Sequence, residues 1–438
     1  MNNDSVVGIP TFTNTALWDA LLPIKPLPPQ AQADAPEIYH SLRIKFGTTS
    51  GNGTEIAIPL ILSSVPETLN ITLIELWSVY IPLLLWLRAS AAERQTISPT
   101  LIGIAGPAGS GKTSLAAILA TLAQALPPSC FPKIAIVSMD AYHLPGKELE
   151  ARGLKSVKGA IETIHGTALA NDLTLFKEGV EAWTKLETFP LSPLIPSVSL
   201  ASRPSWVLRD PNDSQTLLFP EYDRLNTHDP VLGAVRVDAD VRILLVEGLF
   251  IARGDGSILD SSLHNDDDLP DIGEKSVFSS QPSFLTSNNL PLGPDVTAWT
   301  KVLSTLHATI LLRVPLALCR ARCLARRVRS VLGGVEMPPD TSVLSLDVCE
   351  RLEMTVDHYR RADAPTWAAI REDARTRATL ILRLPLPLEL KNEVLNMESG
   401  DALDMPWQQA LKALAASSRI NGQGAFEGVK VVKCKRKK

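Results

Sequence analysis

The residues best suited to chemistry lie between positions 106 and 114. Four of them match the pattern G-x-x-x-x-G-K-[ST], in which backbone amides, a lysine and a hydroxyl surround the phosphates of a nucleotide. Glycines let N–H groups turn inward without a Cβ in the way, and a following helix adds partial positive charge. The pattern predicts a nucleotide-binding loop with these members: Gly106, Pro107, Ala108, Gly109, Ser110, Gly111, Lys112, Thr113 and Ser114.

Each polar residue of this loop has an expected task. Lys112 would reach the β- and γ-phosphates of ATP, and the Thr113 hydroxyl would take one position around Mg²⁺. The alternative is a glycine-rich structural turn. The flanks argue against it, because residues 100 to 105 read as a buried strand and a helical run follows to about residue 125. ATP and Mg²⁺ are therefore the predicted cofactors.

A second candidate group is Asp140, which directly follows the apolar run 133 to 139. Such a run, rich in β-branched residues, suits a strand buried on both faces of a parallel sheet. Ligands of open α/β sheets bind beyond the carboxyl ends of the strands. A carboxylate there could take the proton of an attacking hydroxyl or help to hold Mg²⁺. The alternative is an aspartate that caps a helix.

Glu247 follows another apolar run, residues 241 to 246. A carboxylate in that place fits the acidic residue on the metal side of P-loop enzymes. We therefore expect Thr113 and Glu247 to be the metal ligands.

The elements that must position these groups alternate along the chain. Five apolar runs read as strands, with helical patterns between most of them: 100–105, 133–139, 241–246, 307–314 and 379–384. This alternation predicts a three-layer α/β/α sandwich of the P-loop class with a mainly parallel sheet. Residues 70 to 95 are expected to form one leading helix, kinked at Pro82, that packs on the core and does not span a membrane.

The domain organisation is predicted from composition. Residues 1 to 69 read as an irregular N-terminal arm, residues 70 to 390 as the catalytic domain, and residues 391 to 438 as a C-terminal helix with a basic tail. The segments 192–217 and 254–296 read as insertions in the catalytic domain, the second of them disordered because it holds few apolar residues. The basic tail reads as solvated, with a nuclear address or an anionic surface as the alternatives.

Composition bounds the environment. The chain has 438 residues, 45% apolar and 21% charged, with a net charge of −4, which predicts a soluble globular protein without nucleic acid as its main partner. Its five cysteines form no C-x-x-C pair, and its start lacks the pattern of a signal peptide. We expect a cytoplasmic protein, or a nuclear one if the basic tail acts as an address, with no membrane partner. A homodimer is left open.

Two loops and one helix complete the candidate site. The segments 152–159 and 219–230 mix charged, aromatic and turn residues, as loops that grip a polar substrate do, although solvated loops have the same composition. Helical spacing puts Arg322, Arg326 and Arg329 on one face, which could close over transferring phosphates. A solvated basic face is the alternative.

These pieces, in this order, resemble the superfamily of phosphoribulokinase, uridine kinase and pantothenate kinase. The likeness covers roughly residues 70 to 385 without the insertions, and type I pantothenate kinases and fructokinase-like or uridine-kinase-like bacterial proteins are the nearest forms. It rests on these segments: 106–113, 139–143, 152–162, 220–230, 246–248 and 326–329.

The resemblance implies roles. Asp140 matches the catalytic base, Lys112 and Thr113 match the contacts to ATP and Mg²⁺, and Glu247 matches the acidic residue near metal and substrate. The implied catalytic set is Asp140, Lys112 and Arg327. The implied nucleotide contacts beyond the loop are Arg326 and Arg329. The implied substrate contacts are Tyr142, His143, Lys158, Tyr222, Arg224 and Glu247.

The sequence also departs from the family pattern. Ile161 stands where a proline is usual, and His165 where an aspartate is usual. Ala141 and Tyr142 replace a common glycine and phenylalanine. These changes affect the acceptor side of the site and not the nucleotide side.

The predicted function is an ATP-dependent kinase that phosphorylates a hydroxyl of a small polar metabolite: a sugar, a nucleoside, glycerate or a pantothenate-like compound. One alternative is an ATPase or nucleotide-dependent regulatory protein on the same fold. Another is an interaction protein with a degenerate kinase core, against which the intact Lys112, Asp140 and Glu247 argue.

Overall fold

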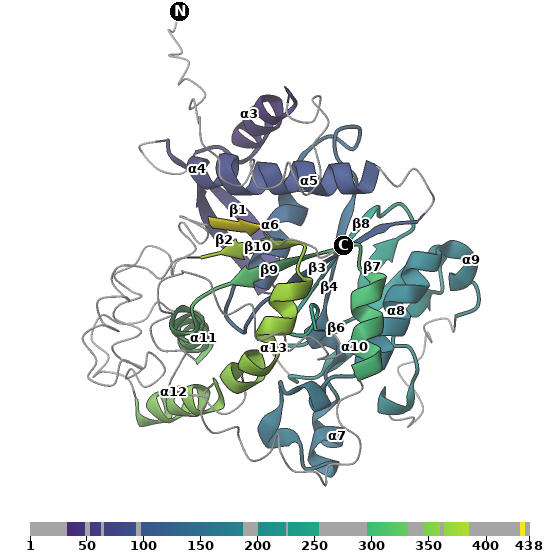
Figure 1. The fold of residues 1–438 in the computed structure, drawn as a ribbon, viewed down its shortest axis with the longest axis vertical. Helices are drawn as coiled ribbons and strands as arrows, with labels where there is room; N and C mark the ends of the chain where they lie inside the picture. Colours follow the sequence, from purple (N-terminus) through teal and green to yellow (C-terminus); the bar gives the residue numbers. More distant parts are fainter. Residues whose placement is uncertain are drawn as a thin grey trace, which may run out of the picture.

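A central sheet of six strands organises the protein (Figure 1), in the order β11-β10-β9-β3-β8-β4. The computed structural model describes residues 33–48, 53–62, 65–92, 98–186, 200–224, 227–253, 296–331, 345–359, 363–384 and 430–433. Five of the six strands run parallel and coincide with the five apolar runs of the sequence: β3 Thr100–Ala105, β4 Ile134–Ser138, β8 Ile243–Gly248, β9 Ala308–Arg313 and β10 Leu380–Arg383.

The sheet is covered on both faces, as the alternation of strands and helices predicts. Every residue of β3 and β8 is buried, which explains why these strands are apolar throughout. Figure 1 shows α3 (Ala35–Phe46) and α5 (Ile81–Ala92) above the sheet in this view. α13 (Ala364–Arg377), α10 (Val296–Thr305) and α8 (Gly166–Glu178) lie below it. The predicted three-layer α/β/α fold is confirmed.

The nucleotide-loop helix and its neighbours complete the inventory. α6 (Lys112–Ala125) follows the loop and packs against β4 and β8. α11 (Leu316–Val331) packs on α12 (Leu346–His358). Shorter elements sit between β4 and the next sheet: α7 Gly146–Ala151, α9 Val180–Trp183 and the 3₁₀ turns Met139–Tyr142, Lys155–Val157, Ile161–Thr163 and Leu200–Ser202.

The N-terminal arm is not irregular where the structure describes it. Helix α3 is followed by an antiparallel hairpin of β1 (Glu55–Leu62) and β2 (Val65–Thr72). Ile56, Ile58 and Leu60 alternate along β1 and are buried, and β1 packs against α6. The prediction was wrong because it weighed the polar composition of the segment and not this period-two alternation. Residues 1–32 lie outside the described part.

The leading helix begins later than predicted. Residues 70 to 72 belong to β2, and the helical stretch starts at α4 (Leu73–Glu75), where Thr72 and Glu75 form a capping box. A π-helical turn, Leu76–Tyr80, then precedes Pro82. Proline lacks a backbone N–H and its ring clashes with the carbonyl group four residues earlier, so the regular α-helical hydrogen bonds are interrupted here. The stretch Leu73–Ala92 is the one candidate membrane span among the described residues by length and composition, and 72% of its most apolar window is buried inside the fold.

A second, three-stranded antiparallel sheet begins within the first predicted insertion, 192–217. It consists of β5 (Leu208–Asp210), β6 (Asp213–Tyr222) and β7 (Pro230–Asp238). The described part of segment 192–217 therefore contributes a strand and the start of another, because Leu217 and the residues around Trp206 are buried. Residues 254 to 295, the predicted disordered insertion, lie outside the described residues.

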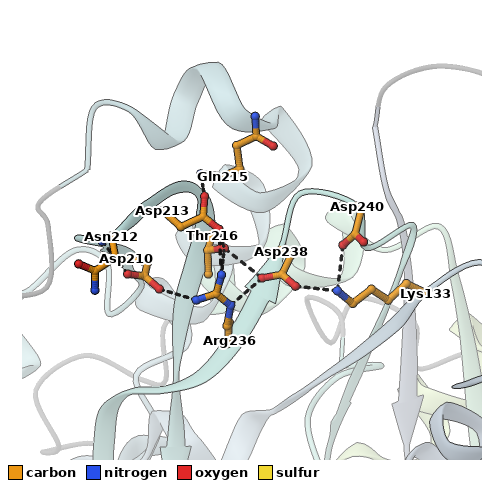
Figure 2. A network of polar contacts seen from close by, with 9 residues as sticks. All are labelled: Lys133, Asp210, Asn212, Asp213, Gln215, Thr216, Arg236, Asp238 and Asp240. Carbon is orange, nitrogen blue, oxygen red and sulfur yellow. Dashed lines mark hydrogen bonds and ion pairs between the residues drawn. The ribbon is translucent and has the colours of Figure 1, made fainter.

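Arg236 ties the three strands of this sheet together (Figure 2). Its guanidinium pairs with Asp210 of β5 at 2.7 Å, Asp213 of β6 at 2.8 Å and Asp238 of β7 at 2.9 Å. Lys133, at the start of β4, pairs with Asp238 at 2.6 Å and Asp240 at 3.0 Å. These ion pairs, here called the Arg236 cluster, connect the end of the small sheet farthest from the β6–β7 turn, its base, to the central sheet.

The basic tail is also corrected in part. Lys430–Lys433 forms β11, which pairs antiparallel with β10 at the edge of the central sheet. This stretch is thus not simply solvated, because its backbone satisfies the open edge of β10. The predicted C-terminal helix lies outside the described residues.

Candidate active site

The nucleotide loop joins β3 to α6, as the sequence predicts. Gly109 and Gly111 have φ angles of 80° and 94°, the left-handed region that glycine adopts without strain. A Cβ on Gly109 would lie 2.2 Å from the Cys319 carbonyl oxygen and 2.9 Å from the Cys323 sulfur. The loop therefore packs so closely on α11 that only glycine fits at this point.

The loop offers donors suited to a phosphate. The Lys112 ammonium donates to the Pro107 carbonyl oxygen at 2.9 Å, so it folds back across the loop. The buried Ser110 hydroxyl lacks a hydrogen-bond partner within the described part of the chain. An unpaired buried hydroxyl is costly, and a phosphate oxygen would satisfy it. With the N-terminus of α6 at the same place, these residues fit the triphosphate of ATP.

Three oxygen-bearing side chains meet beside the loop. Glu247, at the end of β8, accepts hydrogen bonds from the Thr113 hydroxyl at 3.2 Å and from the Ser138 hydroxyl at 2.5 Å. Burial, together with the charge of Asp140, raises the pKa of Glu247. Mg²⁺ is usually held by one or two protein oxygens plus phosphate oxygens, so Thr113 and Glu247 fit it. It would neutralise charge on the phosphates.

Asp140 lies at the carboxyl end of β4, in the 3₁₀ turn Met139–Tyr142. Its backbone amide donates to the Ser138 hydroxyl at 3.3 Å, which links the turn to Glu247. Its carboxylate forms an ion pair with Arg224. Burial raises the pKa of Asp140, but the charges of Arg224, His143 and Lys112 outweigh it and lower the pKa to about 2.

The predicted substrate residues gather around Tyr222. The Lys158 ammonium and the Arg224 guanidinium lie 5.1 Å and 5.4 Å from the centre of its ring. The His143 ring centre is 5.4 Å from that of Tyr222, and its Nδ1 lies 2.8 Å from the Asp140 carbonyl oxygen. Burial lowers the pKa of His143, which favours the neutral imidazole. These four side chains and Asp140 therefore form one polar wall.

The tip of the β6–β7 hairpin holds this wall in place. Lys158 donates to the His228 carbonyl oxygen at 2.5 Å and lies 3.8 Å from the Asp229 carboxylate. Asp229 also accepts from the Gly146 amide at 2.7 Å. The hairpin tip, which belongs to the predicted substrate-gripping segment 219–230, thus contacts the other such segment, 152–159, and the start of α7.

Tyr142 does not join the wall. Its side chain is fully buried, its hydroxyl donates to Asp172 at 2.8 Å, and its ring stacks on Trp206. The expectation that it contacts the acceptor is therefore wrong. The Tyr142 side chain instead points inward and donates to a buried carboxylate.

The arginines of α11 divide into two sets. Arg322 reaches the nucleotide loop, where it donates to the Ser110 carbonyl oxygen at 3.4 Å. Arg326 is exposed, Arg327 is half-buried, and Arg329 follows further along the same helix. A role for these three in closing over the nucleotide stays a prediction.

Three residues near the site were not singled out from the sequence. The Ser138 hydroxyl donates to Glu247. Ser138 is the last residue of β4, and this position could have marked it as a site residue. Asp363, at the N-terminus of α13, comes within 3.6 Å of a Cβ built on Gly159, and burial raises its pKa. Asp172 is fully buried. Neither aspartate follows a strand, so no pattern marked them.

The comparisons with known proteins agree with this geometry. The chain is 30% identical over 182 residues to a pantothenate kinase of Streptomyces avermitilis, which covers 37% of this chain and 55% of the relative. It is 34% identical over 152 residues to a pantothenate kinase of Bacillus velezensis, covering 30% and 47% respectively. The chain resembles the pantothenate kinases. The predicted resemblance to P-loop kinases of this superfamily is confirmed.

The likeness to these kinases is partial. The chain spans about half the length of the curated relatives it matches. No family model matches it. A solved structure, D-glycerate 3-kinase from Cryptococcus neoformans, is 14% identical, covers 68% of this chain and 92% of its own, and superposes with a TM-score of 0.39. That score is too low to carry an inference.

Proposed function

We propose that this protein is an ATP-dependent kinase that transfers the γ-phosphoryl group of ATP to a hydroxyl of a small polar metabolite. One observation carries the proposal. The phosphate loop after β3 and the Asp140 turn after β4 flank Glu247 at the end of β8, which lies between those two strands. A nucleotide and an acceptor alcohol can therefore meet beyond the carboxyl ends of these strands.

The chemistry follows from these groups. The acceptor oxygen would attack the γ-phosphorus, the bond to the β,γ-bridging oxygen would break, and ADP would leave. Asp140 would accept the proton of the acceptor hydroxyl, since its low pKa keeps it ionised at neutral pH. Lys112 would neutralise charge that develops on the transferring group.

The acceptor side favours a metabolite with a negative group. Lys158 and Arg224 flank Tyr222 beside Asp140, and each is already matched to a carboxylate of the protein. A carboxylate of the acceptor could replace Asp140 as the partner of Arg224 and so free the base. This supports a glycerate-like or pantothenate-like acceptor over a neutral sugar or nucleoside. The proposal places the reaction in the cytoplasm, with no nucleic acid or membrane as a partner.

An ATP-consumption screen of the full chain with Mg²⁺ tests the proposal. Sugars, nucleosides, glycerate and pantothenate are offered separately, and the phosphorylated product is identified by mass. We expect turnover that depends on one of these acceptors. Acceptor-independent hydrolysis as the sole activity would favour the ATPase alternative.

The first variant to examine is Asp140→Asn. It should lower the transfer rate by at least about a hundredfold, because the amide cannot take the proton, while the Kd for ATP changes little. Asp240→Asn, at an exposed carboxylate near the amino end of β8, is the control. Transfer at the unchanged rate in the Asp140→Asn protein would contradict the assignment.

A further inference from the structure

Asp172 of α8 is a buried carboxylate that the proposed chemistry does not use. Its side chain is fully buried, yet four donors converge on it. The Tyr142 hydroxyl donates at 2.8 Å, and the Trp206 and Val207 amides donate at 3.1 Å and 3.2 Å. The Ser205 hydroxyl donates as well. So many donors on one buried acceptor define its position closely.

One side of this contact leads to the catalytic turn. Tyr142 lies two residues after Asp140 in the same 3₁₀ turn, and its carbonyl oxygen accepts from the His165 amide at 2.8 Å. Its ring stacks on Trp206 at 5.4 Å with an interplanar angle of 15°. The turn that carries Asp140 is thus anchored to Asp172 at its end.

The other side leads to the acceptor wall. Residues 205 to 207 run directly into β5, which pairs with β6. β6 ends at Tyr222, and Arg224 follows two residues later. Asp172 therefore contacts the turn that carries Asp140 and the residues that lead into β5, whose neighbouring strand β6 ends two residues before Arg224.

The Asp172 carboxylate joins two parts of the chain because it accepts from both of them at once. Burial raises the pKa of Asp172 to about 7 in spite of its four hydrogen bonds, so the group is held in an environment unfavourable to its charge. An apolar side chain would leave the Trp206 and Val207 amides without this acceptor and would no longer hold the two segments at a defined spacing.

We propose that Asp172 is a positioning residue that sets the distance between Asp140 and Arg224, acting through Tyr142 on one side and residues 205–207 on the other. This inference rests on the proposed function. It assigns to Asp172 no contact with the acceptor or the nucleotide.

Two variants test it with little change in volume. Tyr142→Phe removes the hydroxyl and keeps the ring on Trp206, and Asp172→Asn keeps the size of the side chain. Asp210→Asn is the matched control, since it alters a nearly buried aspartate of the polar cluster at the base of the small sheet. For each protein we measure the Kd for ATP, the acceptor KM and the kcat of transfer.

We expect Tyr142→Phe and Asp172→Asn to lower kcat/KM for the acceptor by about 10- to 100-fold, with the Kd for ATP within about twofold of the parent, because small misplacements of reacting groups have effects of this size. Since both changes break one link, the double variant should lose little more than either single variant. Asp210→Asn should keep its kcat/KM. Folded variants with unchanged kcat/KM, or with kcat and ATP binding reduced in the same proportion, would overturn the proposal.

Amide hydrogen exchange separates this proposal from the proposed function. Exchange in residues 139–143 and 222–224 should quicken in Tyr142→Phe and Asp172→Asn but not in Asp210→Asn. If the parent protein transfers phosphate to no acceptor, the proposed function fails while these rates still decide the positioning role. Unchanged exchange in both segments would refute it.

Discussion

Gly109 shows how one small residue fixes the nucleotide loop against α11. Its φ of 80° is left-handed, and a Cβ there would meet the Cys319 carbonyl oxygen at 2.2 Å. Gly153 is also left-handed, with φ 68°, but nothing lies within 4 Å of its Cβ position. Substituting each glycine therefore distinguishes two costs: an alanine at either position is strained by its φ angle, but only an alanine at position 109 would also clash with a neighbouring group.

Gly109→Ala should therefore destabilise the protein by about 3 kcal/mol and weaken ATP binding, because the loop must move away from α11. Gly153→Ala should cost only about 1 kcal/mol, from its backbone conformation alone. Urea unfolding and ATP titration of both variants check this. Equal costs for the two would show that the contact with Cys319 has no effect.

Asp172 gives a pH dependence with a definite sign. Its pKa rises from 3.8 to about 7 on folding, so the folded state binds the proton more tightly than the unfolded chain does. Its contribution to stability is fully present below about pH 3.8 and is lost as the pH rises through about 7.

The free energy of unfolding should thus decline between about pH 3.8 and about pH 7 in the parent protein by more than in Asp172→Asn, which cannot titrate at this position. Urea midpoints at several pH values provide the measurement. The difference between the two proteins isolates this group from the other buried carboxylates. Parallel pH curves would exclude Asp172 as the titrating group.

The β6–β7 hairpin connects two places of different chemistry. Its base holds the Arg236 cluster and its tip holds Tyr222, Arg224 and Asp229. Register confirms this separation, because Leu218 pairs with Arg236 near the base while Tyr222 pairs with Pro230 near the tip. The hairpin therefore links the Arg236 cluster at its base (Figure 2) to the acceptor wall at its tip.

Arg236→Met should lower the thermal midpoint, because three carboxylates of three strands would then repel one another without a shared cation. The loss should shrink in high salt, which screens exposed charges. Arg351→Met, which breaks a simple pair between Arg351 and Asp347 on α12, is the control and should change the midpoint little. A loss that does not respond to salt would point to packing and not to charge.

Two segments that lie far from the candidate site in the sequence pack against the central part of the fold. The N-terminal hairpin β1–β2 packs against α6, and β11 pairs with β10 at the edge of the sheet. Both cover surface that the five parallel strands and their helices would leave open. The central sheet and these two segments therefore stabilise one another.

Removing residues 430 to 438 should lower the free energy of unfolding by about 1 to 3 kcal/mol and promote aggregation, because Leu380–Arg383 would become an unpaired edge. The Kd for ATP should stay the same, since β10 is separated from β3 by β9. Unfolding curves and light scattering test both parts. A truncated chain as stable as the parent would show that β11 adds nothing.

Much of the candidate active site could be predicted from local patterns in the sequence. Five apolar runs separated by helical patterns are typical of a parallel sheet covered on both faces, and that topology brings the strand ends with Asp140 and Glu247 beside the loop of Lys112. Local conformation is also visible in the chain, since left-handed turns need glycine at positions such as 109 and 111. The order of groups along the chain was enough to place these residues.

Other features depend on contacts between distant segments. Tyr142 turns inward because Asp172, 30 residues away, needs a donor, and Arg224 pairs with Asp140 across 84 residues. The alternating β1 strand and the tail strand β11 acquire their places only by packing on α6 and β10. No local period encodes such partners, because which buried polar group meets which is settled by the way whole elements pack together.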